Sequence, residues 1–171
     1  MQKLALINES FCKLMVYRRF KKRTQILYFI CDIKLTLALT MTLFMIRKIS
    51  GLAALLGALT VVIGAFGAHS LKEKLDPEAL ISFETGVKYM MYHVLVLLLV
   101  TNNSRLTEKS KIIISYLFLL GILFFSGSIF MIALDIVSAK QIWFITPLGG
   151  LLFIFGWLYA AFSFLKSDAK K

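Results

Sequence analysis

The sequence predicts an all-α membrane protein, a four-transmembrane-helix bundle with a short interfacial helix between spans one and two. Two observations predict this fold class. Of the 171 residues, 59% are hydrophobic and 17% are charged, whereas soluble domains carry roughly 25% charged residues. Uncharged runs long enough to cross a bilayer also recur along the chain. Only helices satisfy their backbone hydrogen bonds within one such segment in lipid.

Four spans follow in order. The first, residues 49–68, is an uncharged run of twenty residues, and a helix of that length extends about 30 Å. The second, residues 87–101, is short unless Lys88 extends its amine toward the headgroups. The third and fourth, residues 112–134 and 142–165, are uncharged throughout. Pro147 lies within the fourth span and predicts a kink there.

The connection between the first two spans contains a helix start. Asp76 is a predicted N-cap, Pro77 suits the first helical position, and Glu78 complements the helix dipole. These residues predict a helix over residues 77–85, at or near the interface, that leads into the second span. The other connections, residues 102–111 and 135–141, are short and polar.

Residues 1–44 are interpreted as a basic N-terminal extension, and residues 45–171 as the membrane domain. Residues 26–46 resemble a fifth span, but Asp32 and Lys34 make its insertion marginal. The two residues that follow it are also too few for a helical hairpin. We therefore expect either a biological start at Met41 or Met45, or an extension that is disordered or an amphipathic segment on anionic lipid.

The charge distribution predicts the orientation. Residues 1–48 have a net charge of +8 and residues 49–171 one of +3. Eight lysines and arginines of residues 45–171 fall on the side of the two termini and four on the other side. The positive-inside rule then places both termini in the cytoplasm of a bacterial inner membrane protein. Because positive loops account for the basic excess, no nucleic-acid partner is expected; the expected partners are the bilayer and a second copy or other membrane proteins.

Small residues recur every three or four positions in the first span and again in the fourth. Small side chains let helix backbones approach closely in lipid, so helix packing is the favoured interpretation. A narrow conduit lined by part of this stripe is the alternative. The stripe comprises Ser50, Ala53, Gly57, Thr60, Gly64 and Gly67 in the first span, and Gly149, Gly156 and Ala160 in the fourth.

A candidate polar cluster surrounds the start of the second span. It comprises His69, Glu84, Lys88, Tyr89, Tyr92 and His93. The last three share a helix face, which is typical of an interfacial aromatic belt. Alternatively, this face points inward and meets His69. Glu84 and Lys88 have the spacing of an ion pair.

No catalytic residues are predicted, because the chain has no nucleophile–base pair and no recognised catalytic motif. No metal or cofactor is predicted either. Two histidines fall short of the ligand sets of haem and zinc sites, although Glu84 is the nearest further candidate ligand. We therefore expect a protein that is not an enzyme.

The motifs resemble one known family. Residues 64–69 read GAFGAH, residues 70–75 read SLKEKL, residues 83–89 read FETGVKY, Tyr92 and His93 follow, and residues 146–150 read TPLGG. Together they resemble domain-of-unknown-function family 423, small four-helix membrane proteins of bacteria with animal relatives called transmembrane protein 256. The resemblance covers residues 45–165. It implies a multi-pass plasma-membrane protein of unestablished activity, and a start near the first span.

Three functions are compatible with these observations. The favoured hypothesis is a structural or interaction protein that works through helix packing. The alternatives are a small-solute transporter or channel, and a redox module in which His69 and His93 hold haem or a quinone.

Overall fold

The computed structural model describes residues 23–168, and it describes side chains over residues 29–166. The chain divides into two units, residues 1–43 and 44–171. All regular elements in the described part are helices, and four of them are long and apolar enough to cross a membrane. The predicted all-α fold class with four membrane-spanning helices is therefore confirmed.

The first unit is described from residue 23 onward. Residues 23–43 belong to helix α2, which covers Arg23–Phe66 and continues through Arg47 and Lys48 without a break. In residues 29–43 the helix exposes apolar side chains such as Phe29 and Leu37. The remainder of the predicted extension, residues 1–22, lies outside the described residues.

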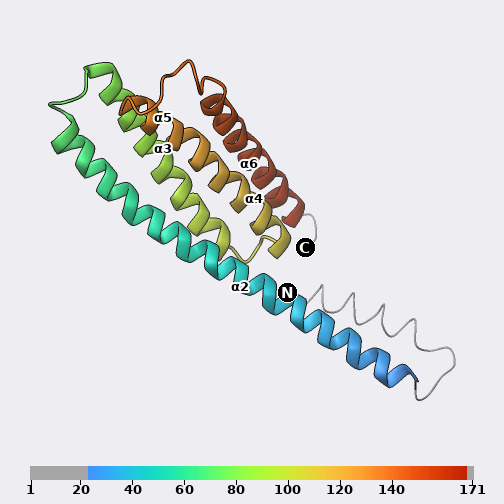
Figure 1. The fold of residues 1–171 in the computed structure, drawn as a ribbon. Helices are drawn as coiled ribbons and strands as arrows, with labels where there is room; N and C mark the ends of the chain where they lie inside the picture. The colour runs from blue at the N-terminus through green and yellow to red at the C-terminus, as the bar shows by residue number, and fades with distance from the viewer. Residues whose placement is uncertain (1–22, 169–171) are drawn as a thin grey trace. The chain divides into compact units, whose positions relative to one another are not determined.

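The second unit contains the rest of α2 and all later helices (Figure 1). The bounds are η1 Gly67–Leu71, α3 Pro77–Asn102, α4 Glu108–Gly121, η2 Ile122–Ser126, α5 Gly127–Ala133 and α6 Ile145–Asp168. The elements η1 and η2 are single wide turns of π-helix. Because η2 joins α4 to α5 without interruption, these three elements form one span, Glu108–Ala133.

The start of α3 agrees with its local sequence. The Asp76 carboxylate accepts a hydrogen bond of 2.8 Å from the Ala79 N–H, and Pro77 opens the helix. The predicted interfacial helix over residues 77–85 is not a separate element, because these residues are the first turns of α3. Gly86 does not break the helix. It is buried where an added Cβ would lie 2.8 Å from the Phe130 ring, so packing with α5 favours a small residue there.

The start of α6 corrects another expectation. Pro147 was expected to kink a span that begins at residue 142, but α6 begins at Ile145. Pro147 therefore lies in the first helical turn, where the missing N–H and the ring disturb no hydrogen bond. At the preceding helix end, Asp135 closes α5 with a left-handed φ of 55°.

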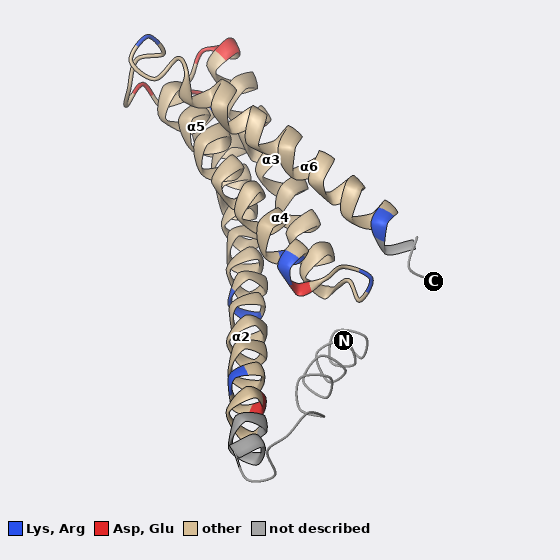
Figure 2. Ribbon diagram, turned by 90° about the vertical axis from the view of Figure 1, so that its right-hand side faces the viewer, with Lys and Arg blue, Asp and Glu red and all other residues tan. Residues whose placement is uncertain are grey.

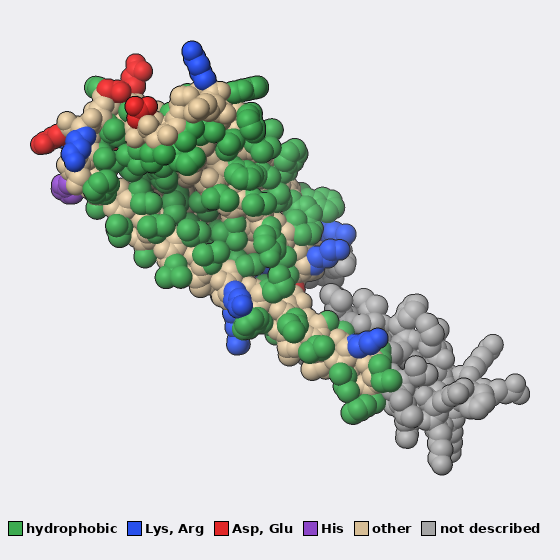
Figure 3. Space-filling model, in the orientation of Figure 1, with side chains coloured by type: hydrophobic (Ala, Val, Ile, Leu, Met, Phe, Trp, Pro, Cys, Tyr) green, Lys and Arg blue, Asp and Glu red, His purple; other side chains and the backbone are tan. Residues whose placement is uncertain are grey.

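The core of the second unit lies between α3 and its neighbours. Helix α3 packs on α4, η2 and α5, and α6 packs mainly on α4 and η2. Helix α2 lies against α3 through Gly57 and Gly64, where added Cβ atoms would lie 3.3 Å from Val94 and Val87. Charged residues gather toward the ends of α3 to α6 (Figure 2), and one face between these ends is covered by hydrophobic side chains (Figure 3).

Candidate functional site

His93 is the histidine that enters the bundle, and both of its ring nitrogens have partners. Its side chain extends from α3 and the residue is 5% exposed. Nδ1 lies 2.8 Å from the Tyr89 carbonyl oxygen, and the Trp157 indole N–H points at Nε2 over 3.3 Å. A carbonyl only accepts and an indole only donates. We therefore assign the neutral tautomer with the proton on Nδ1 and the lone pair on Nε2.

Aromatic rings from three helices surround the imidazole. The Phe153 ring of α6 stacks on it with centroids 3.5 Å apart and planes 6° apart. Phe118 of α4 lies 5.2 Å from it and meets Trp157 edge to face. We call His93, Phe118, Phe153 and Trp157 the His93 cluster. Its geometry is that of a packed core with one polar link between α3 and α6.

Two glycines make room for these rings. A Cβ added at Gly121 of α4 would lie 2.5 Å from the Phe153 ring, and one at Gly156 of α6 would lie 2.6 Å from the Phe118 ring. Each helix therefore receives a phenylalanine of the other over a glycine. This reciprocal fit holds α4 close to α6, the helix from which Trp157 reaches His93 on α3.

The remaining residues of the predicted polar cluster lie elsewhere. His69 is exposed in η1, and no hydrogen bond between residues 23 and 168 joins it to His93. Glu84 and Lys88 form the expected i, i+4 ion pair at 3.3 Å, with both side chains exposed. The structure therefore does not bring these three residues to His93.

The two tyrosines differ. Tyr92 is 57% exposed, whereas the Tyr89 ring lies over Phe125 with centroids 4.8 Å apart. Tyr89 is joined to His93 by its backbone carbonyl and by a ring contact of 6.2 Å. The shared helix face thus divides into an inward histidine, a tyrosine at the edge and an outward tyrosine.

The small-residue positions lie mostly at helix contacts. Ala53 and Thr60 of α2 are buried, and a Cβ at Gly67 would lie 2.8 Å from Phe83. The half-buried Ser50 donates its hydroxyl hydrogen to the Ile46 carbonyl over 3.1 Å. Ala160 of α6 is buried. The closest approach is at Gly149, where a Cβ would lie 2.3 Å from the Phe125 backbone nitrogen in η2.

Several features had no distinct signal in the sequence. Phe153 and Trp157 are four residues apart, a spacing common to many apolar helices. Nothing in the sequence pairs either of them with His93, which precedes Trp157 by sixty-four positions. The Ser128 and Thr146 hydroxyl oxygens lie 2.6 Å apart and link α5 to the start of α6. Ser115 and Ser126 are fully buried, and their hydroxyls have no hydrogen-bond partner among the described residues.

An ion pair marks the start of α4. Lys111 Nζ lies 3.3 Å from Glu108 Oε1, and the two side chains are 10% and 22% exposed, respectively. Thr107 caps the same helix through the Ser110 N–H at 3.2 Å. These charges sit at the end of the helix, so none of them enters the His93 cluster.

The arrangement around His93 does not suit a metal or haem ligand. Coordination through Nε2 would take the lone pair that accepts the Trp157 N–H, and coordination through Nδ1 would remove the proton that Nδ1 donates to the Tyr89 carbonyl. Within the part of the chain whose side chains are described, no group of three or more His, Cys, Asp or Glu side chains is placed to hold a metal ion. The chemistry that this geometry supports is hydrogen bonding between helices.

Comparisons with known proteins give one family. Residues 63–150 match the family described as protein of unknown function DUF423. A UPF0382 membrane protein of Haemophilus influenzae is 37% identical over 72% of this chain and 98% of its own length. A UPF0382 membrane protein of Staphylococcus haemolyticus is 41% identical over 67% and 93%. The UPF0382 inner membrane protein YgdD of Escherichia coli is 36% identical over 61% and 79%. No solved structure matches.

Proposed function

The chain belongs to the DUF423 family of multi-pass bacterial membrane proteins, and from this premise we propose that it is a non-enzymatic packing protein of the inner membrane. Its role is to associate with other membrane helices, either of a second copy or of other proteins. Both termini face the cytoplasm. One observation carries the proposal. The buried His93 is the residue best suited to chemistry, and both of its ring nitrogens are hydrogen-bonded while its ring stacks on Phe153 of α6.

The polar groups inside the bundle support the same role. Thr60 and Thr101 donate their hydroxyl hydrogens to carbonyls one turn earlier in their own helices. Ser128 and Thr146 bond to each other between helices. A hydrogen bond between helices, such as the one between Ser128 and Thr146, stabilises their contact in lipid by about 0.6 kcal/mol.

Neither alternative function receives a supporting observation. Intramembrane ionisable residues mark transport paths, and among the described residues the charged side chains nearest the core, Glu108 and Lys111, pair at the start of α4. A redox module through both histidines would require His69 and His93 to face one cofactor, whereas His69 is exposed and His93 is enclosed by rings.

Helix α2 offers the most surface to a partner helix. In an apolar stretch of 18 residues from its span, 17% is buried, whereas 39% is buried in the corresponding stretches of the spans of α3 and of α4–α5. Its outward side chains include Leu55, which is 71% exposed. A partner helix would associate with this exposed face by van der Waals packing, because lipid gives apolar side chains no net drive to associate.

Photocrosslinking in the native membrane tests the packing role. A benzophenone amino acid replaces Leu55 of α2 or Leu158 of α6 in the full chain expressed at its natural level; both residues are exposed. We expect a discrete protein adduct from Leu55, with one reproducible mass and a composition that mass spectrometry identifies. Lipid adducts alone from both positions would contradict the proposal.

A second measurement distinguishes packing from transport. His93→Phe keeps an aromatic ring on Phe153, so a packing protein retains its cellular phenotype in proportion to the amount of folded protein. A transporter that uses His93 instead loses solute flux in proteoliposomes while its abundance stays normal. The second result would refute the packing proposal.

A further inference from the structure

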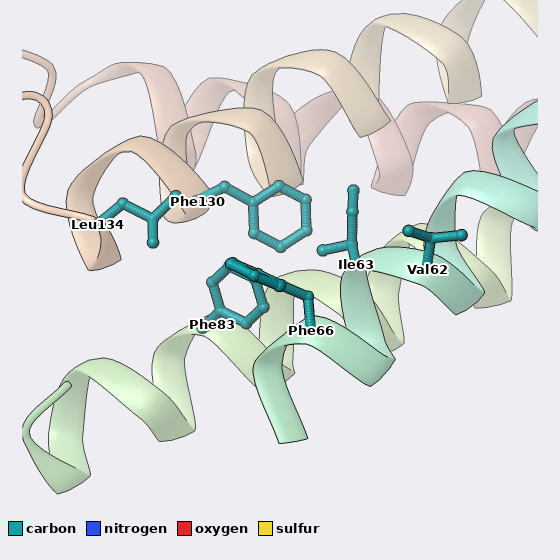
Figure 4. Close-up of a pocket in the computed structure, with 6 residues that line it drawn as sticks. All are labelled: Val62, Ile63, Phe66, Phe83, Phe130 and Leu134. Carbon is teal, nitrogen blue, oxygen red and sulfur yellow. The ribbon is translucent and has the colours of Figure 1, made fainter. Parts of the chain in front are cut away.

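We propose that a groove beside the end of α2 binds one acyl chain of a phospholipid whose headgroup is zwitterionic. The groove has a volume of about 320 Å³ and lies between α2, α3 and α5. Its lining is wholly apolar: Val62, Ile63, Phe66, Phe83, Phe130 and Leu134 (Figure 4). The site depends neither on the orientation of the chain in the membrane nor on its packing role.

The groove lies where side chains of α2, α3 and α5 meet. Phe83 of α3 packs under Gly67, and its ring lies 5.0 Å from that of Phe130 on α5. Phe66 and Val62 stand on the α2 side, and Leu134 closes the α5 side (Figure 4). The rings of Phe83 and Phe130 therefore lie between residues of α2 on one side and Leu134 on the other.

An acyl chain suits this shape better than the other available occupants. Water needs two to four polar partners, and the groove offers none. A partner helix needs an interaxial distance of 8–10 Å to each neighbour. The groove of about 320 Å³ is already flanked by helices, so it is too small to receive another one. Val62 and Phe66 are 63% and 52% exposed, so the groove opens toward lipid. A flexible hydrocarbon chain fills such a space and gains dispersion contacts.

The charges next to the groove indicate the headgroup. Leu71 and Leu75 pack with Ile63, Phe83 and Phe130, which places the connection after η1 at the end of the groove. Lys72 and Lys74 lie in this connection, and both are exposed.

The carboxylates of the same connection complete the pattern. Glu73 lies between the two lysines and Glu78 opens α3, while Asp76 is occupied as the N-cap. The lysine amines can pair with a lipid phosphate, and the neighbouring carboxylates can pair with an ammonium group. This pattern matches a zwitterionic headgroup better than a purely anionic one. Phosphatidylethanolamine has this charge pattern.

Native mass spectrometry of the purified full chain tests the site. The chain is exchanged into detergent with added synthetic phosphatidylethanolamine, phosphatidylglycerol or diacylglycerol. We expect one phosphatidylethanolamine to stay bound per chain. Val62→Phe and Leu134→Phe add rings at the two rims of the groove and should each reduce the bound fraction by roughly fivefold, the change that about 1 kcal/mol of lost packing produces.

Matched variants exclude general effects. Leu158→Phe adds the same ring on α6 at a position that is 62% exposed, and it should leave lipid binding unchanged. Lys72→Gln with Lys74→Gln should remove the preference for phosphatidylethanolamine over diacylglycerol, whereas Lys140→Gln should not. All variants are checked for helix content by circular dichroism.

Three outcomes would overturn the proposal. Equal lipid retention by the wild type and both rim variants would show that the groove binds nothing specifically. Stronger retention of phosphatidylglycerol would refute the zwitterionic headgroup. A dimer that the rim variants dissociate would assign the groove to a second copy of the chain instead of a lipid.

Discussion

At the scale of single residues, His93 has the interactions whose loss is expected to change stability. Its ring is held by a stack on Phe153 and by two hydrogen bonds. In lipid the alternative to such a bond is an unsatisfied polar group in hydrocarbon, although measured values between membrane helices average only about 0.6 kcal/mol. Loss of the Trp157–His93 bond by removal of Trp157 leaves Nε2 of the buried His93 without its partner.

A double-mutant cycle measures this bond. His93→Phe and Trp157→Phe should each destabilise the folded chain by about 1 kcal/mol, and the double variant by about 0.6 kcal/mol less than their sum. The free energy of unfolding is measured by dodecyl sulfate titration with circular dichroism as the readout. Tyr92→Phe is the control, because that side chain is 57% exposed. Strictly additive effects would show that the two side chains do not interact.

The cap of α3 gives a second prediction for a single residue. The Asp76 carboxylate satisfies the Ala79 N–H at 2.8 Å. Asp76→Ala should therefore lower the free energy of unfolding by about 1 kcal/mol, while Asp76→Asn should retain most of the stability. The same titration checks both variants. If the asparagine variant loses as much as the alanine variant, the carboxylate acts by its charge instead of as a cap.

At the scale of helices, the contact between α6 and η2 depends on two neighbouring glycines that are not equivalent. A Cβ at Gly149 would lie 2.3 Å from the Phe125 backbone nitrogen, whereas one at Gly150 would lie 3.8 Å from the Phe125 side chain. Backbone cannot move aside as the tip of a side chain can. Close approach of α6 to the wide turn η2 therefore requires glycine at position 149 only.

This difference predicts opposite outcomes for adjacent substitutions. Gly149→Ala should destabilise the chain by about 1–3 kcal/mol, because α6 must shift away from η2. Gly150→Ala should be neutral or slightly stabilising, because alanine favours helix. Thermal unfolding in detergent compares the two. Equal losses of stability would mean that glycine is needed at both positions for a reason other than this contact.

The helical spans show which expectations depend on local sequence. The Asp76 N-cap was predicted and is confirmed, because capping involves residues three positions apart. The separate interfacial helix was not observed, since α3 runs continuously from Pro77 to Asn102. The kink expected at Pro147 depended on where the helix begins, which periodicity and hydropathy do not specify. Helix α6 begins at Ile145, so Pro147 lies in its first turn and not in its interior.

At the scale of the whole molecule, the orientation in the membrane remains a prediction from charge. Of the lysines and arginines in residues 45–171, eight fall on the side of the two termini and four on the other side. The eight are Arg47, Lys48, Arg105, Lys109, Lys111, Lys166, Lys170 and Lys171, and the four are Lys72, Lys74, Lys88 and Lys140. Labelling of introduced cysteines tests it. Ser138→Cys and Ser104→Cys are made separately in a full chain that also carries Cys12→Ser and Cys31→Ser.

An impermeant maleimide is then added to intact cells. We expect it to label position 138 and to reach position 104 only after lysis, because positive loops stay in the cytoplasm. Labelling of position 104 in intact cells, with position 138 protected, would reverse the orientation. Abundance of each variant in the membrane fraction is the control.

The candidate site could be predicted only in part. Tyr89, Tyr92 and His93 share a helix face by their spacing, yet spacing cannot tell which edge of that face points inward. The answer lies in α4 and α6, whose glycines Gly121 and Gly156 admit the rings that enclose His93. His69 was grouped with His93 by its place at the end of a span, but its side chain stays exposed.

The sequence by itself determined the membrane location and the presence of four spans, because hydropathy and backbone hydrogen bonding in lipid are properties of single segments. It did not determine their bounds: the helix of the first span begins long before residue 49, and that of the second begins at Pro77 instead of residue 87. It also determined which residues are small enough for close packing. Only the tertiary structure decided that α2 leaves a lipid-facing groove beside Phe83 and Phe130. Only it paired His93 with Trp157 across sixty-four positions. Such pairings depend on the rotation and depth of each helix, which arise from the fit of all the helices together and not from any one of them.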